Sequence, residues 1–249
     1  MKLLTANLFR VAALALLLIL LFRTEWLSFL LTPLTKNNAP AVYTQSSLPL
    51  LALGHLQLVL MSIAASAVVA ILGGVFVTRR SGADFLPLSR AIANAGQTFP
   101  PVAVLALAVP AMGFGAGPTL VALFLYGLLP IFENTVSGLR QVSPAVLDAA
   151  DGMGMNAAQR LFQVELPLAL PLIIEGVKVA TVINIGTATI GSTVAAKGLG
   201  EVIIAGLISD NTAFILQGGL IVGLMALLIY DAVGLVESAM TRRMGLRTA

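Results

Sequence analysis

The sequence lacks several residues on which protein chemistry often depends. It has no cysteine, which excludes a disulfide framework and a thiolate metal site and leaves the redox compartment open. Its one histidine, His55, has no companion ligands and no place in a Ser-His-Asp arrangement. His55 precedes the second apolar run, so we expect it at the membrane interface. We expect no metal, no cofactor and no covalent catalysis.

Charged residues are scarce as well. They make up 10% of the chain, whereas roughly a quarter of the residues of a soluble domain are charged. Hydrophobic residues make up 58%, and the mean hydropathy is +0.99. The apolar runs have helical length, unlike the roughly ten-residue alternating strands of an outer-membrane barrel. The composition therefore predicts an all-α integral membrane protein with one helical bundle.

A phosphate-binding loop of the form G-x-x-x-x-G-K-[ST] is also missing from the sequence, so this chain cannot hold ATP as P-loop proteins do. The net charge of +3 could suggest a nucleic-acid partner. The basic residues are scattered, however, without a patch or interleaved aromatic residues, which argues against nucleic-acid binding. If the chain works together with ATP, we expect hydrolysis on a separate polypeptide, and we expect that the chain itself is not an enzyme.

Six apolar runs are predicted to cross the membrane, at about residues 11–22, 56–77, 99–112, 119–136, 168–185 and 214–236. The first is shorter than the roughly 20 residues that a span requires. Arginines at both of its ends can snorkel, and no small-residue cleavage site follows, so we interpret it as an uncleaved span. We divide the chain into a first span with an external loop (1–55), a transmembrane core (56–238) and a basic cytoplasmic tail (239–249).

The distribution of basic residues predicts the orientation in the membrane. An arrangement with both termini in the cytoplasm places ten Lys and Arg residues inside and three outside, as the positive-inside rule favours. The inside set is Lys2, Arg10, Arg79, Arg80, Arg90, Arg140, Arg160, Arg242, Arg243 and Arg247, and the outside set is Arg23, Lys36 and Lys197. The same arrangement places the polar stretch at 143–166 in the cytoplasm.

That polar stretch predicts two short helices joined by a bend. Ser143 before Pro144 has the chemistry of an N-cap followed by a first-turn proline, and a helix should begin there. This helix should present Ala149 and Ala150 as a small, closely approachable surface. It should end at Gly154, because a residue without a Cβ readily takes the left-handed turn.

The second short helix should begin at Asn156. Gln159, three positions later, completes a capping-box pair with Asn156. Pro167 then begins the next apolar segment.

The spacing in this stretch resembles the E-A-A-x3-G-x9-I-x-L-P loop of binding-protein-dependent ABC importer permeases. The residues that carry the resemblance are Asp148, Ala149, Ala150, Gly154, Val164, Leu166 and Pro167, with Asp for the usual Glu and Val for the usual Ile. The resemblance implies the type I, MetI-like permease fold and a multi-pass protein of the bacterial inner membrane. It also implies that Asp148, Ala149, Ala150, Gly154, Leu166 and Pro167 form a coupling loop that inserts into a groove of the ATPase. A plain amphipathic linker is the alternative, but a linker needs no fixed spacing.

Partners follow from the same resemblance. Six spans are too few to enclose a full alternating-access path, so a second permease subunit, identical or paralogous, is implied. A separate ABC ATPase subunit and an external substrate-binding protein complete the importer, and membrane lipid surrounds it. A self-sufficient secondary transporter is the rival class, but it predicts inverted repeats with paired broken helices and coupling-ion carboxylates, which we do not find.

Three further segments narrow the resemblance to osmoprotectant uptake permeases for glycine betaine, choline and related quaternary amines. They lie at 97–110, 125–135 and 184–190. One departure is Lys197, where relatives often have a run of Gly and Ala, and a positive charge there is unwelcome beside a quaternary ammonium. An ABC permease for another small solute, such as an amino acid, methionine or a phosphonate, remains the alternative.

Polar residues within the apolar runs are candidates for the translocation pathway. In the fifth run Glu175, Lys178, Thr181, Asn184 and Thr187 recur every three residues, which keeps them near one slowly rotating helical face. Glu175 and Lys178 can neutralise each other structurally. Hydrogen bonding between helices is an alternative role for the others. With the residues of the similar segments, the predicted pathway set is Gln97, Asn134, Thr181, Asn184 and Thr187.

A glycine-spaced stretch follows the fifth run, at 186–200. It is too polar and too broken for a regular span. Irregular backbone at membrane depth is tolerated where protein or a wet cavity surrounds it. This stretch resembles the external re-entrant segment of the permease fold.

Overall fold

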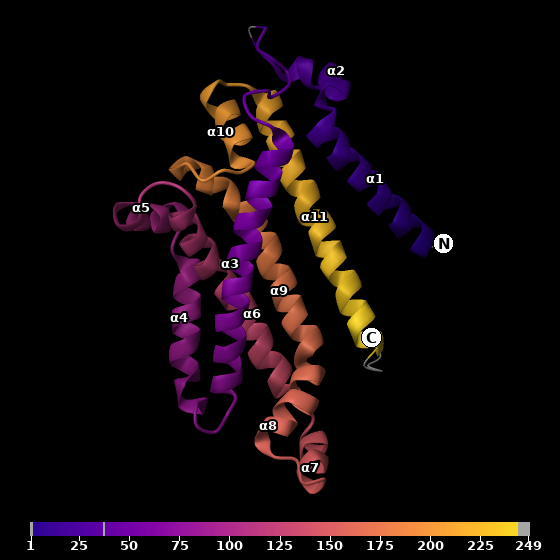
Figure 1. Cartoon of the computed structure of the whole chain (residues 1–249), viewed down its shortest axis with the longest axis vertical. Helices are drawn as coiled ribbons and strands as arrows, with labels where there is room; N and C mark the ends of the chain where they lie inside the picture. The colour runs from indigo at the N-terminus through magenta and orange to yellow at the C-terminus, as the bar shows by residue number, and fades with distance from the viewer. Residues whose placement is uncertain (1, 37, 244–249) are drawn as a thin grey trace. The chain divides into compact units, whose positions relative to one another are not determined.

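A computed structural model describes residues 2–36 and 38–243, and the regular elements in this part of the chain are helical (Figure 1). The α-helices are α1 (Lys2–Phe22), α2 (Ser28–Leu31), α3 (Leu48–Val77), α4 (Leu86–Thr98), α5 (Pro101–Met112), α6 (Ala116–Arg140), α7 (Pro144–Gly152), α8 (Ala157–Arg160), α9 (Leu166–Thr187), α10 (Gly200–Ile208) and α11 (Thr212–Arg243). Short 3-10 segments occupy Thr24–Leu27, Thr32–Leu34, Ala83–Phe85 and Ala188–Val194, and Leu161–Glu165 is a π-helical turn. The predicted all-α fold is confirmed.

The chain divides into two compact units. The first comprises residues 1–62, 100–123 and 182–230, and the second comprises 63–99, 124–181 and 231–249. The helices α3, α6, α9 and α11 each contribute residues to both units. The polar stretch between α6 and α9 belongs wholly to the second unit.

Four helical segments in the described part of the chain are long and apolar enough to cross a membrane. They are Leu48–Val77, Ala116–Arg140, Ala157–Val194 and Thr212–Arg242. Two bent helix pairs raise the number to as many as six, namely Asn7–Phe22 with Thr24–Leu34 and Ala83–Thr98 with Pro101–Met112. These segments overlap the six predicted runs, and each extends beyond its predicted boundaries at one end or both.

The predicted third span at 99–112 is wrong as a regular membrane-crossing helix. Its helix α5 has 12 residues, too few to cross a bilayer alone. The chain bends by 93° between Thr98 and Pro101. Phe99 and Pro100 both have extended backbone, with ψ values of 129° and 139°, because a residue before proline is pushed out of the helical region.

Arg90, predicted on the cytoplasmic side, lies in a helix and not in a connecting segment. Arg90 lies within α4, where its Nε and Nη2 donate to the two carboxylate oxygens of Glu133 on α6 at 2.7 and 2.8 Å. This bidentate pair neutralises both charges, so α4 can pack against the apolar helix α6 without an isolated cation. The predicted inside position of Arg90 stays a prediction.

The external loop predicted for Thr24–Pro49 is partly helical. Short helical segments cover Thr24–Leu34, and α3 begins at Leu48 with Pro49 in its first turn, where proline needs no hydrogen-bond donor. His55 therefore lies inside α3. It is fully buried, and its Nε2 lies 2.9 Å from the carbonyl oxygen of Ile185. The helix α3 thus starts earlier than the hydropathy suggests, and the predicted interfacial depth of His55 stays a prediction.

The basic tail predicted at 239–249 begins within α11, which continues to Arg243. Arg247, which belongs to the predicted inside set, lies outside the described residues. The side chains of Lys2 and Arg243 are also outside the described part of the structure.

Small residues allow close helix packing in the second unit. A Cβ on Gly176 of α9 would lie 2.8 Å from the carbonyl oxygen of Pro130 on α6, and one on Gly138 of α6 would lie 3.0 Å from that of Ala169 on α9. Such approaches are typical of membrane helices, which gain van der Waals contact from small interface residues. They hold α6 and the first half of α9 together at the base of the polar stretch.

Candidate functional site

The polar stretch 143–165, called the coupling segment below, folds as predicted into two short helices joined by a bend. Figure 1 shows α7 and α8 lying side by side at the end of α9. Asp148 and Ala149 of α7 are exposed, whereas Ala150 is buried. The small surface expected from two alanines is therefore presented by Ala149 alone.

The start of α7 differs in detail from its prediction. The helix begins at Pro144, but the Ser143 hydroxyl makes no capping hydrogen bond to any described residue. The Ser143 carbonyl oxygen instead accepts bonds from the N–H groups of Val146 and Leu147 at 3.0 and 3.2 Å. Pro144 removes one of the donors that a serine side chain would otherwise satisfy, which reduces the need for a cap.

Gly154 ends α7 in the left-handed conformation, as predicted, with φ of +78°. The Met155 N–H donates to the Ala150 carbonyl at 3.2 Å, and the Gly154 N–H donates to the Asp151 carbonyl at 2.9 Å. This pair of bonds is the Schellman motif, which satisfies the last carbonyls of the helix. A Cβ at Gly154 would meet no atom within 4 Å, so the need for glycine here is a property of the backbone and not of packing.

The start of α8 confirms the predicted capping box. The Gln159 N–H donates to Asn156 Oδ1, and the Asn156 N–H donates to Gln159 Oε1, both at 2.9 Å. Two helix-end donors are thereby satisfied by one pair of side chains.

Pro167 stands in the first turn of the apolar helix α9 (Leu166–Thr187), as predicted, but no break separates α9 from the residues before it. The chain runs on from α8 through the π-helical turn Leu161–Glu165 into α9, and the Leu166 N–H bonds to the Leu161 carbonyl. Proline has no N–H and its ring crowds the preceding turn, so a wider turn accommodates it without breaking the helix.

Four charged side chains stabilise the coupling segment, and this arrangement was not predicted from the sequence. Glu165 is 3% exposed and accepts bonds from Arg79, which follows α3, and from the Arg160 Nε at 3.1 Å. The Arg79 Nη1 to Glu165 Oε1 distance is 3.0 Å. Arg160 Nη1 in turn donates to both carboxylate oxygens of Asp151 on α7, at 2.8 and 2.7 Å. We call these four residues the charge network.

The charge network has two cations and two anions, so it is neutral. It connects α7, α8, the π-helical turn and the end of α3, all within the second unit. Charge-assisted bonds of this kind are directional and stronger than neutral ones, so they fix the angle at which α7 leaves the helix bundle. A carboxylate at position 165 between the apolar Val164 and Leu166 is the signal in the sequence that could have indicated a buried pair.

The coupling segment also exposes large apolar side chains. Met153 at the bend is 70% exposed and Phe162 in the π-helical turn is 68% exposed. They accompany the exposed Asp148 and Ala149 on a segment that is otherwise polar. Aromatic residues and methionine are enriched in protein interfaces, so this surface has the composition of a docking site.

The predicted pathway residues on α9 make local or internal hydrogen bonds. The hydroxyls of Thr181 and Thr187 donate to their own helix, to the carbonyls of Val177 and Ile183. Asn184 is fully buried, and its Nδ2 donates to the Leu123 carbonyl on α6 at 2.9 Å and to Ser62 Oγ on α3 at 3.3 Å. Its pathway role stays a prediction and requires these helices to separate during transport.

The other two predicted pathway residues belong to the second unit. The Gln97 side chain on α4 donates to the Tyr126 carbonyl on α6 at 2.9 Å, and Tyr126 Oη donates to the Phe99 carbonyl at 2.6 Å. The Asn134 side chain donates to the Pro130 carbonyl of its own helix at 2.8 Å. Pro130 has no N–H for the Tyr126 carbonyl one turn earlier in α6, and the Gln97 amide supplies that carbonyl with a donor. Gln97 and Asn134 are partly exposed.

The predicted neutralisation of Lys178 is confirmed. Lys178 is 7% exposed and pairs with Glu175 on α9, one helical turn away. It also contacts Glu237 on α11 at 3.2 Å. A buried cation with two carboxylate partners has the features of a structural group.

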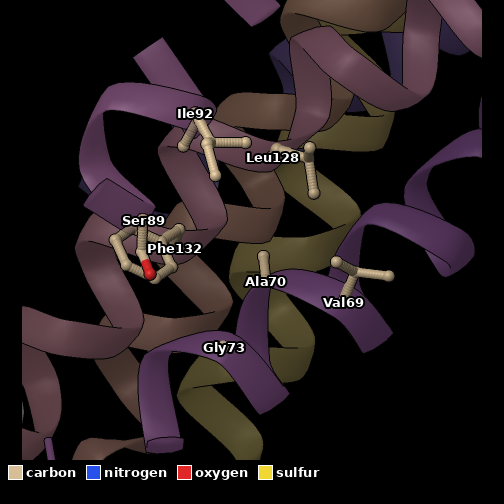
Figure 2. A pocket seen from close by; sticks show the side chains of 8 residues that line it. Val69, Ala70, Gly73, Ser89, Ile92, Leu128 and Phe132 are labelled. Atoms are coloured by element: carbon tan, nitrogen blue, oxygen red, sulfur yellow. The ribbon is translucent and has the colours of Figure 1, made fainter. Parts of the chain in front are cut away.

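One hollow in the second unit is apolar. Its volume is about 170 Å³, and Figure 2 shows Ile92 and Ser89 from α4 facing Val69, Ala70 and Gly73 of α3. Leu128 and Phe132 of α6 complete the lining, with Ala93. With Ser89 as the one polar side chain among the described residues around it, this hollow offers no chemistry for a polar solute.

A family model described as binding-protein-dependent transport system inner membrane component matches residues 70–245. Similar curated proteins include an osmoprotectant import permease protein of Salmonella typhimurium, 41% identical over 70% of this chain and 74% of its own length. A carnitine transport permease protein of Listeria monocytogenes is 42% identical over 69% and 77% of the two chains. A choline transport system permease protein of Bacillus subtilis is 36% identical over 75% and 85%.

Solved structures show the same fold. A chain of the inward-facing MetNI methionine ABC transporter superposes with a TM-score of 0.70 at 21% identity, over 80% of this chain and all of the other. A second crystal form of that transporter gives 0.67 at 24% identity, over 76% and 94% of the two chains.

Proposed function

The chain belongs to the family of binding-protein-dependent transport system inner membrane components, and on this premise we propose that it carries quaternary-amine osmoprotectants. As an inner-membrane permease subunit of an ABC importer, it works with an ATPase and a substrate-binding protein. The three named relatives have osmoprotectants, carnitine and choline in their names, and each is at least 36% identical to this chain. This shared class of cargo supports glycine betaine, choline or carnitine as the solute.

The observation that carries the permease mechanism is the geometry of the coupling segment. It combines a bend fixed by Gly154, an anchored base at the charge network, and an exposed surface with Asp148, Ala149 and Met153. A rigid segment whose end is exposed can transmit a movement of the ATPase to α9. We therefore propose that the exposed surface with Asp148, Ala149 and Met153 binds in a groove of the ATPase and that α9 moves with it.

The remaining partner is a second permease subunit, identical to this chain or paralogous. Four to six spans are too few to enclose a pathway that opens alternately to the two sides.

We propose that the cargo is bound tightly by another protein of the importer. The chain has one Trp and three Tyr, which is poor material for the aromatic cage that a trimethylammonium group usually requires. We propose that the external binding protein supplies this cage.

The orientation that fits these roles has both termini in the cytoplasm and the segment around Lys36 outside. The absence of cysteine allows a direct test. A Lys36→Cys variant should react with an impermeant maleimide in spheroplasts, whereas Arg80→Cys should react after permeabilisation. Arg80 is a better position for an inside cysteine than Arg160, because replacing Arg160 would break its ion pairs in the charge network. The reversed labelling pattern would exclude this orientation.

The cargo is tested by reconstitution in proteoliposomes. Radiolabelled glycine betaine, choline or carnitine should accumulate when permease, ATPase and binding protein are present together, and omission of any one should abolish uptake. Uptake by the permease alone, driven by an ion gradient, would overturn the ABC assignment of this chain. A complete system that transports other small solutes and ignores all quaternary amines would overturn the cargo and leave the mechanism standing.

A further inference from the structure

A second hollow lies in the first unit and differs in chemistry from the apolar one. Its volume is about 400 Å³, within the range of small-molecule sites. It is formed by the segment before α3, the 3-10 segment Ala188–Val194, and α10 with the residue after it. The lining residues are Tyr43, Gln45, Ser192, Glu201, Ile204, Ala205, Ile208 and Ser209.

Glu201 supplies the one carboxylate of this lining. It stands in the first turn of α10 and is partly exposed. Within residues 2–36 and 38–243, no ion pair or hydrogen bond of the Glu201 carboxylate is seen. Lys197, four positions before Glu201, is exposed and is not among the lining residues. Lys36 is paired with Asp210 at 2.7 Å, and neither of these two lines the hollow. Among the described residues, the lining therefore carries one negative charge and no cation.

Tyr43 contributes a fixed aromatic side chain to the same lining. It is 4% exposed, its N–H donates to Gln217 Oε1 at 3.1 Å, and its ring packs edge-on against Phe214 at 5.4 Å. Ile204 and Ile208 add apolar surface. A quaternary ammonium combines positive charge with an apolar shell, so it suits a carboxylate next to an aromatic ring and aliphatic side chains.

Polar groups complete the lining. The Ser192 and Ser209 hydroxyls donate to backbone carbonyls, at 3.2 and 2.7 Å, and their oxygens remain able to accept a bond. Gln45 is exposed and offers an amide. These groups can meet the hydroxyl of an amino alcohol, whereas the lining offers no cation for a substrate carboxylate.

We propose that this hollow is an entry site for cationic solutes and that Glu201 sets the preference of the importer for a cation over a zwitterion. The proposal rests on the quaternary-amine cargo proposed above. In the orientation proposed there, the segment around Tyr43 and Gln45 faces the outside, where a binding protein delivers its solute. One aromatic ring in place of a cage gives brief residence, which suits a site that must pass its solute on.

The test compares choline, a cation, with glycine betaine, a zwitterion, in the complete importer. Glu201→Gln should raise the KM for choline about fivefold, as expected for one exposed ionic contact, and should change that for glycine betaine less than about twofold. The kcat for both solutes should be unchanged. Equal effects on the two solutes, or no effect on either, would overturn the proposal.

Asp210→Asn is the matched control. It removes the same charge from an exposed residue two positions after Ile208, outside the lining. It should leave the ratio of the two KM values unchanged. An Asp210→Asn variant that reproduces the Glu201→Gln shift would show a general surface-charge effect and would overturn the site.

A second measurement separates this proposal from the cargo. Saturation-transfer NMR with tetramethylammonium on the purified permease should show contact that Glu201→Gln weakens and Asp210→Asn preserves, with neutral tert-butanol as the reference. Equal transfer in the wild-type protein and Glu201→Gln overturns the site even if choline is transported. Selective loss in Glu201→Gln supports the site even if the importer proves to carry another cation.

Discussion

The coupling segment and the polar residues of α9 use hydrogen bonds in opposite ways. In the coupling segment, side chains cap helix ends and connect separate elements, as Asn156 and Glu165 show. On α9, the hydroxyls of Thr181 and Thr187 bond to the backbone of the same helix. The first pattern fixes a segment at a defined angle, whereas the second adds no bond between α9 and its neighbours.

Asn184 is an exception among the polar residues of α9. It lies on α9 between the two threonines, yet it bonds across to α3 and α6 and is fully buried. It therefore behaves like a member of the coupling segment and holds α9 in its present register. Four substitutions test the difference, from the largest expected effect to the smallest.

The largest effect is expected from Glu165→Ala, which removes the anion shared by Arg79 and Arg160. Breaking a buried ion pair of this kind costs roughly 3 kcal/mol, at the lower end because both arginines remain partly open to solvent. Substrate stimulation of ATP hydrolysis should be lost while basal hydrolysis continues. The measurement is ATP hydrolysis in proteoliposomes with and without loaded binding protein, normalised to the amount of permease.

Two variants serve as controls for this result. Glu165→Gln should restore part of the stimulation, since the amide oxygen can still accept from one arginine. Glu133→Gln weakens the ion pair with Arg90, which is also in the second unit but does not touch the coupling segment. Loss of stimulation in Glu133→Gln to the same extent would show that general destabilisation, and not the network, is responsible.

The second effect concerns the bend. Gly154→Val should cost roughly 1 to 3 kcal/mol of backbone strain, because φ of +78° disfavours a branched side chain. Membrane insertion should be normal and coupling should fail. Gly152→Val is the matched control, since Gly152 lies two residues away, also meets no neighbour within 4 Å, and has no positive φ. Full stimulation in Gly154→Val would remove the coupling segment from the mechanism.

The third effect separates Asn184 from its neighbours on α9. Asn184→Ala removes the amide that bonds to the Leu123 carbonyl and to Ser62. A hydrogen bond between membrane helices contributes about 0.6 to 2 kcal/mol, so a thermal unfolding midpoint measured in detergent should fall. Ser66→Ala removes another side-chain bond to an α6 carbonyl, at Phe124, and is the comparison in the second unit. A midpoint that does not fall in Asn184→Ala would exclude a locking role for this residue.

The smallest effect tests the proposed pathway on α9. Thr187 is partly exposed, whereas Thr181 is 4% exposed, and both hydroxyls make the same bond one turn back. Thr187→Val should therefore raise the KM for uptake by about twofold, and Thr181→Val should leave it unchanged, as befits substitutions worth about 0.5 kcal/mol or less. Equal KM values for the two variants in a proteoliposome uptake assay would argue against Thr187 as a lining residue.

Much of the helical architecture could be predicted from the sequence. The long apolar runs predicted α3, α6, α9 and α11, because a backbone in lipid has to satisfy its hydrogen bonds within the helix. The errors lie where hydropathy is ambiguous. The apolar run at 99–112 predicted a span, but the two prolines at its start turned it into the short helix α5 after a sharp bend.

The coupling segment shows the same division within a few residues. The left-handed Gly154 and the Asn156–Gln159 capping box could be predicted, since each depends on residues at most five positions apart. The charge network could not, because Arg79 and Glu165 are 86 positions apart. The spacing of residues along the chain cannot predict a contact between residues so far apart. Such a contact depends on how the intervening helices pack.

The sequence by itself determined that this chain is a helical membrane protein, where its main spans lie, and which segment bends at a glycine between two short helices. These features follow from hydropathy, residue type and local backbone preference. The tertiary structure alone decided that His55 is buried and that Arg90 of α4 pairs with Glu133 of α6. It also decided that Glu165 anchors the coupling segment, and that Glu201 lines a hollow to which the described residues contribute no cation. Each of these depends on which distant groups desolvate or neutralise a side chain, and that is fixed only when the helices pack.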